Sequence, residues 1–276
     1  MLKVKNLSIS FRMYDRMLDQ IIKKAVHDIS MDVQAGEIHA VVGSSGSGKS
    51  LLAHAVMDIL PENAIMGGEI YYKDEMLNGK KIAALRGKDI TLIPQSISYL
   101  DPLMKTNRQI FGKYFDREKQ KKLFDQFDLR VSDGDKFPFQ LSGGMARRAL
   151  IMTSVVADSK LVVADEPTPG LDPQLATEIL SVFRTMADEG RGILLITHDV
   201  DLVCEVADRI SIFYGGTILE TLSVKDFLAG NAKHPYTKAL WNALPQNDFE
   251  AIDMAELARI CKEGGYPLPD HDNIFE

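Results

Sequence analysis

EIHAVVGSSGSGKSLLAHAV, residues 37–56, is the stretch that decides the fold. The apolar run EIHAVVG (37–43) predicts a buried strand, and the pattern after it predicts a helix that begins near Lys49 and ends before Pro61. Between strand and helix the chain matches GxxxxGK[ST], a loop that binds phosphate groups. The loop consists of Gly43, Ser44, Ser45, Gly46, Ser47, Gly48, Lys49 and Ser50. We therefore expect an α/β protein that binds a phosphate chain.

The residue types in this loop suit a nucleoside triphosphate. Glycines let the backbone turn tightly, so that several N–H groups point at one phosphate chain. The helix that follows adds the positive end of its dipole. Lys49 can reach the β- and γ-phosphates, and the Ser50 hydroxyl can ligate Mg²⁺. The loop alone leaves kinases, GTPases and many ATPases open.

Two more apolar strands end in polar residues that suit phosphate chemistry. LVVAD (161–165) ends in Asp165 and is followed by Glu166, while GILLIT (192–197) is followed by His198. The carboxyl ends of parallel strands form the ligand crevice of an open α/β sheet, so these side chains are expected near the loop. Asp165 is a candidate Mg²⁺ ligand, and Glu166 a candidate general base that polarises the attacking water. His198 is a candidate contact of the γ-phosphate.

The rest of the chain alternates strands and helices, which predicts a mostly parallel core sheet. An antiparallel β layer is expected from LKVKNLSISF (2–11) and AVHDISMDV (25–33), joined by the polar stretch 12–24. Further strands are expected at 67–72, 88–94 and 209–214, with a short strand and short helices after Gly216. We expect a main domain over 1–230, a helical subdomain inserted at about 104–159, and a short C-terminal helical extension over 231–276.

Composition restricts the function classes. The 276 residues are 45% hydrophobic and 26% charged, as in a protein with a full core, and the net charge of −7 disfavours nucleic acid as a partner. No run approaches the roughly 18 apolar residues of a membrane span, and the first ten residues do not resemble a signal peptide. We expect a cytoplasmic protein that reaches the membrane through partners. Cys204 and Cys261, the only cysteines, fit a reducing compartment.

The segment LSGGM (141–145) resembles the signature sequence of ABC ATPases, usually written LSGGQ, and stands shortly before the acidic strand as in that family. Ser142, Gly143 and Gly144 open a helix and offer a second anion cradle of hydroxyl and backbone N–H groups. The resemblance implies that this signature covers the ATP held by the loop of a second ATPase subunit. It also implies ATP hydrolysis, with ATP and Mg²⁺ as cofactors.

Other motifs of that family follow in order. Gln95 in LIPQS matches the Q-loop glutamine, which the resemblance assigns to catalysis and to Mg²⁺. Residues 170–172 resemble the D-loop, and 197–199 match the switch region. Phe11 fits the aromatic residue that stacks on adenine, and Tyr14 is the alternative.

Three features resemble the oligopeptide, dipeptide and nickel importers: SGGM itself, LRGKDITLIPQSISYLDPLM (85–104) and HPYTKALWNALP (234–245). This branch implies a second, different ATPase subunit, two transmembrane permease subunits and an extracytoplasmic substrate-binding protein. The chain would then lie peripherally on the cytoplasmic face of the inner membrane. Peptide and nickel or metallophore substrates stay open. Cys261 alone cannot form the iron–sulfur cluster of some peptide-importing relatives.

Two alternatives within the family are disfavoured. Soluble ABC ATPases of repair or translation carry long coiled coils or two ATPase units, and the sequence has neither. A regulatory subunit that binds ATP without hydrolysing it would lack Glu166 or His198, and both are present. Ala146 and Arg147 replace the usual Arg-Gln after SGGM, and Arg147 and Arg148 are interpreted as structural or interface residues. Residues 270–272, Asp-His-Asp, are interpreted as a polar terminus rather than a metal site.

Overall fold

A six-stranded sheet forms the centre of the computed structural model, which describes residues 1–14, 18–112, 116–244, 247 and 253–269. Its strand order is β10-β9-β3-β8-β7-β6, and all neighbours are parallel except β9 and β10. The strands are β3 (Ile38–Val42), β6 (Ile90–Ile93), β7 (Leu161–Asp165), β8 (Gly192–Thr197), β9 (Arg209–Tyr214) and β10 (Thr217–Ser223). Every residue of β3, β7 and β8 is buried, which explains their continuous apolar sequences.

Successive side chains of this sheet pack into two separate hydrophobic cores, one on each face. Ala40 and Leu195 face a core formed with the helices α5 (Gly143–Val156) and α6 (Pro173–Asp188). Val41 belongs to the opposite core, under α1 (Lys49–Val56) and a second sheet. Since successive strand residues point to opposite faces, each central strand stabilises both layers.

The second sheet is antiparallel, with the order β2-β1-β4-β5. Its strands are β1 (Leu2–Tyr14), β2 (Gln20–Val33), β4 (Ala64–Tyr72) and β5 (Glu75–Met76). The expectation of a polar linker over 12–24 is wrong for its described residues: β1 continues to Tyr14 and β2 begins at Gln20, with Arg12 opposite Ile22. Backbone pairing between the two strands satisfies the polar groups of this exposed hairpin, so it needs no alternating apolar pattern.

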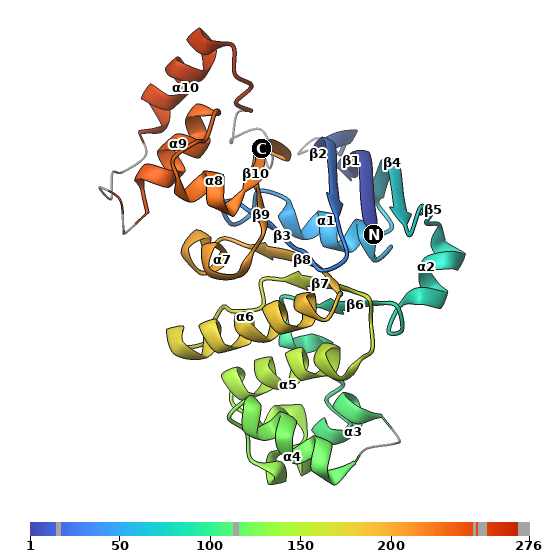
Figure 1. Ribbon diagram of the computed structural model, residues 1–276. Helices are drawn as coiled ribbons and strands as arrows, with labels where there is room; N and C mark the ends of the chain where they lie inside the picture. The colour runs from blue at the N-terminus through green and yellow to red at the C-terminus, as the bar shows by residue number, and fades with distance from the viewer. Residues whose placement is uncertain (15–17, 113–115, 245–246, 248–252, 270–276) are drawn as a thin grey trace.

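Helices between β6 and β7 form a separate group at one end of the molecule (Figure 1). They are α3 (Thr106–Phe111), α4 (Arg117–Gln126) and α5, with the short 3₁₀ helices η1 (Ile97–Tyr99), η2 (Val131–Asp135) and η3 (Pro138–Gln140). At the other end lie α8 (Val224–Leu228), α9 (Pro235–Asn242) and α10 (Met254–Gly264), while α2 (Gly79–Leu85) and α7 (Val200–Val206) complete the set described. The predicted α/β class with a mostly parallel sheet, an antiparallel layer and inserted helices is confirmed. No helix in the described part of the chain has the length and apolarity that a bilayer crossing requires.

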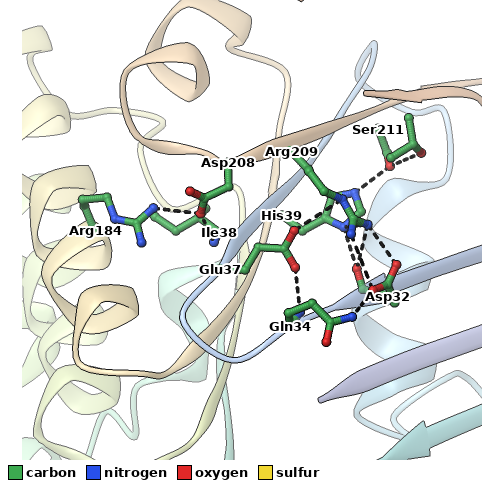
Figure 2. Close-up of polar contacts among 10 residues, drawn as sticks. Asp32, Gln34, Glu37, Ile38, His39, Arg184, Asp208, Arg209 and Ser211 are labelled. Carbon is green, nitrogen blue, oxygen red and sulfur yellow. Dashed lines mark hydrogen bonds and ion pairs between the residues drawn. The ribbon is translucent and has the colours of Figure 1, made fainter. Parts of the chain in front are cut away.

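A buried polar network joins the two sheets (Figure 2). His39 of β3 donates from Nδ1 to the carbonyl of Asp32 in β2 at 2.6 Å, and its Nε2 lies 2.8 Å from Ser211 Oγ in β9. Because a carbonyl only accepts, Nδ1 carries the proton and Nε2 accepts from the serine hydroxyl. Arg209 pairs with Asp32 at 2.9 Å and with Glu37 at 3.3 Å. Burial, reinforced by Arg209, lowers the pKa of His39 to about 4.

This lowered pKa predicts that the folded protein loses stability as the pH decreases. Between about pH 6.5 and pH 4 the unfolded chain binds a proton at His39 that the folded chain excludes, so the free energy of unfolding decreases as pH falls through that window. From pH 7.5 to pH 5 the loss from this one group is about 2 kcal/mol. Denaturant titrations of the wild type and of His39→Gln at both pH values measure it. Equal pH dependence in the two proteins would refute the assignment.

Candidate nucleotide-binding site

Three parallel strands end at one edge of the central sheet and bring the candidate residues together. Val42 pairs with Thr197, and Asp165 pairs with Ile196, so β3, β7 and β8 end at nearly the same level. The phosphate-binding loop, Glu166 and His198 directly follow these three strand ends. The sheet register therefore sets the spacing of the site.

The loop 43–50 has a left-handed backbone conformation, which favours glycine, at two positions. Gly48 has φ 102° and Gly46 has φ 78°. A methyl group on Gly43 would lie 2.1 Å from the Phe213 carbonyl oxygen of β9, so the loop starts in direct contact with the neighbouring strand. Lys49 is buried, and its ammonium donates to the carbonyls of Gly43 (2.9 Å) and Ser44 (2.7 Å). The lysine is thus held inside the loop.

The charges beside the loop are concentrated in little space. Burial lowers the pKa of Lys49, an effect that the carboxylates of Glu166 and Asp165 oppose. Burial raises the pKa of Asp165, and a hydrogen bond from the Ser50 hydroxyl at 3.0 Å opposes that shift. A hydroxyl and a carboxylate oxygen side by side are hard donors of the kind that Mg²⁺ prefers. These two residues fit the predicted ion.

Glu166 and His198 form a hydrogen-bonded pair. His198 Nδ1 lies 2.9 Å from Glu166 Oε2, and the carboxylate accepts the bond. Glu166 is buried and has φ 48°, a left-handed conformation that costs about 1 kcal/mol outside glycine. Its N–H donates to the carbonyl of Ile196 at 2.8 Å, which fixes this conformation. The carboxylate and the half-exposed imidazole are consequently held as one unit.

Gln95 lies in the exposed loop after β6, next to buried Pro94. Arg147, one turn into α5, donates to the Pro94 carbonyl at 3.3 Å. Burial lowers the pKa of Arg147, and attraction to Glu166 opposes the shift, so this guanidinium lies within electrostatic reach of the candidate base. The sequence interpretation gave Arg147 a structural or interface role only. Its place one turn after the predicted anion cradle was the signal that could have linked it to the site.

The signature residues lie apart from this loop. Ser142 caps α5 and accepts from the Met145 N–H at 3.3 Å, and the added methyl position of Gly143 meets no atom within 4 Å. Figure 1 places the start of α5 in the inserted helical group, away from α1. The helix start at Ser142, Gly143 and Gly144 therefore belongs to a different part of the chain's fold from the loop 43–50.

The two adenine candidates differ in exposure. Phe11 is half-buried against the core under the antiparallel sheet, whereas Tyr14 is 69% exposed at the hairpin opposite Gln20. The stacking role stays a prediction for either residue.

Known proteins match both the sequence and the fold. A family model described as "ABC transporter" matches residues 26–169. An oligopeptide transport ATP-binding protein of Lactococcus lactis subsp. cremoris (strain SK11) is 34% identical over 92% of this chain and 78% of its own length. The chain belongs to the ABC transporter family. A dipeptide transport ATP-binding protein of Bacillus subtilis (strain 168) is 31% identical to this chain, over 93% of this chain and 80% of the relative's own length.

Solved structures agree on the ABC fold. A dimeric bacterial ABC transporter cassette has a TM-score of 0.70 at 22% identity, covering 81% of this chain and 99% of the cassette. Its post-hydrolysis form bound to ADP and Pi also has a TM-score of 0.70, at 23% identity over 81% of this chain and 99% of that one. The predictions of family, fold class and ATP-hydrolysing subunit are confirmed.

Replacing Lys49 with alanine should weaken nucleotide binding to the ABC subunit about 10- to 100-fold, because a buried ammonium that meets phosphate oxygens is lost. Titration calorimetry of the purified chain with ADP measures the affinity. Lys121→Ala, on the exposed face of α4, is the matched control and should bind like the wild type. Unchanged ADP affinity in the Lys49 variant would contradict the assignment.

Proposed function

We propose that this chain is an ATP-hydrolysing subunit that energises an importer of peptides, at the cytoplasmic face of the inner membrane. The observation that carries the proposal is the pairing of His198 with a buried Glu166 beside Lys49, Ser50 and Asp165, in a chain whose relatives are named as peptide transport ATP-binding proteins. Nickel or metallophore import is the second candidate, on the sequence resemblance alone. We assign the ATPase domain to 1–230, its helical subdomain to about 104–159 and the extension to 231–276.

The proposed chemistry is hydrolysis of the γ-phosphate. Backbone N–H groups of the loop 43–50 bind the phosphate chain, and Lys49 neutralises the β- and γ-oxygens. Ser50, Asp165 and Gln95 would hold Mg²⁺, which when bound neutralises charge on the phosphates. Glu166 accepts a proton from the attacking water, and His198, hydrogen-bonded to Glu166, contacts the γ-phosphate and helps to orient that water.

A second ATPase subunit is part of this proposal. The helix start at Ser142, Gly143 and Gly144 is separate from the loop of the same chain, and the first N–H groups of a helix have no acceptor within the helix itself. An ATP bound in the loop 43–50 therefore needs donors from another subunit, and this signature in turn serves that subunit's ATP. In this proposal the pair of subunits forms two ATP sites, each made of the loop of one subunit and the signature of the other.

Permease contact is proposed for the surface beside Gln95. Tyr99 and Leu103, which follow Gln95 in the chain, are 57% and 85% exposed, and Phe139 of the same helical group is 71% exposed. A hollow of about 680 Å³ in the same helical group is lined in part by Leu103, Met104 and Phe137. Leu103 and Met104 follow Gln95 in the segment between β6 and α3, which supports a route by which a permease senses the state of the nucleotide.

Replacing Glu166 with glutamine should stop hydrolysis while ATP still binds, because the amide keeps the shape but cannot take the proton. We expect turnover to fall at least about 100-fold, in line with loss of a general base. Phosphate release from the full complex with ATP measures turnover. Size-exclusion chromatography with ATP measures whether the variant stays paired with the second ATPase subunit around the unhydrolysed ATP. Glu205→Gln, in α7, is the matched carboxylate control. Normal turnover by the Glu166 variant would remove it from the role of base.

Purification of the intact complex from its native membrane tests the partners and the substrate. We expect two permease subunits, a second ATPase chain and a binding protein that takes up peptides in calorimetry. A binding protein that takes up nickel chelates instead would support the second candidate. Recovery of this chain without any membrane protein would contradict both.

A further inference from the structure

The four residues Tyr266 to Pro269, just after α10, contact the start of α9, the helical core and the turn between β9 and β10, and we call them the tail segment. The ring of Tyr266 meets His234 edge-on at 5.4 Å, and the Pro267 carbonyl accepts from His234 Nε2 at 3.0 Å. Leu268 packs on the helical core. Pro269 lies so close to Gly215 that a methyl group there would be 2.5 Å from Pro269 Cβ.

His234 anchors this segment at the start of α9. It is 3% exposed, and its Nδ1 accepts from the Tyr236 N–H at 3.1 Å. The Tyr236 ring in turn packs on Tyr214, the residue before Gly215, with centroids 4.7 Å apart. The extension therefore contacts the turn between β9 and β10 at two residues, with Tyr236 against Tyr214 and Pro269 against Gly215.

The other side of that turn touches β2. His27 N–H donates to the Gly216 carbonyl at 2.8 Å, and a methyl group on Gly216 would lie 2.4 Å from the Ala25 carbonyl oxygen. Gly215 and Gly216 have φ of 54° and 78°, so both positions favour glycine for the backbone as well as for space.

The next layer is the phosphate-binding loop itself. A methyl group on Gly48 would lie 3.3 Å from the same Ala25 carbonyl oxygen and 3.8 Å from the ring of Phe213. Gly43, at the other end of the loop, abuts the Phe213 carbonyl. A continuous series of close contacts thus leads from Pro269 to the phosphate-binding loop. It runs through the turn 215–216 and then through Ala25 and Phe213.

We propose that the tail segment is a positioning element for ATP binding, with Pro269 as its contact residue and the turn 215–216 as the relay to the loop. This proposal rests on the proposed nucleotide site at Lys49. A phosphate cradle needs its N–H groups aligned before the ligand arrives, and closely packed interiors transmit small displacements. Pressure of Pro269 on the turn keeps Ala25 and Phe213 against the loop, so release of the tail segment lowers nucleotide affinity.

A pair of complementary substitutions tests the contact in the purified full chain, by calorimetry with ADP and by melting without nucleotide. Gly215→Ala places a methyl group against Pro269 and displaces turn or tail, and should weaken ADP binding about tenfold, equivalent to one misplaced hydrogen-bond donor. Pro269→Gly removes the ring and should weaken it about threefold. The double variant, with room for the methyl group, should bind no more weakly than Pro269→Gly alone. Gly87→Ala, at φ 69° with open space around it, controls for the backbone cost and should bind like the wild type.

Two results would overturn the proposal. One is wild-type affinity in both Gly215→Ala and Pro269→Gly, even with lowered melting temperatures, because a tail that only stabilises the fold shifts melting alone. The other is a double variant as weak as Gly215→Ala, which would place the effect in the turn backbone. If Gly215→Ala does not melt cooperatively, Pro269→Gly decides by itself, and wild-type affinity there overturns the proposal. Retained ADP binding in Lys49→Ala would instead refute the underlying site.

Discussion

Parallel pairing of β3 with β8, and of β8 with β7, is the constraint on which the site depends. It brings three strand ends to one level, so a loop, a carboxylate pair and a histidine from distant parts of the sequence meet at one edge. These strands are buried on both faces and fill two cores, so their register cannot slip without exposing apolar side chains. The packing of these strands therefore fixes the relative positions of the side chains at the edge.

The buried charges at this edge stabilise one another. Lys49 is buried where a cation is costly, and the nearby carboxylates of Asp165 and Glu166 offset part of that cost. Glu166 is held by its own backbone bond to Ile196 and by His198, in a conformation that an unsupported residue would leave. The opposite end of the sheet carries the His39 network, which ties β2 to β3 and β9 away from the nucleotide.

Sequence reasoning located the loop, the strand ends and the signature because each combines a local pattern with special residue types, such as Gly48 before Lys49. It failed for the hairpin over Arg12–Tyr14 and Gln20–Ile22, where pairing between strands, not side-chain alternation, decides the structure. Arg147 beside Glu166 and Pro269 against Gly215 were also missed. The first is an electrostatic attraction and the second a packing contact; both join residues of different elements, and no spacing rule reports them. Residues 270–272 lie outside the described residues.

The central claim is that this chain holds one half of each of two ATP sites. Vanadate-trapped photolabelling with 8-azido-ATP in the assembled transporter reports hydrolysis at each ATPase subunit separately. With Ser142→Arg, we expect this chain to keep its own label, because its loop, Glu166 and His198 are intact, while the partner subunit loses its label. Loss of label from this chain with retention on the partner would contradict the account.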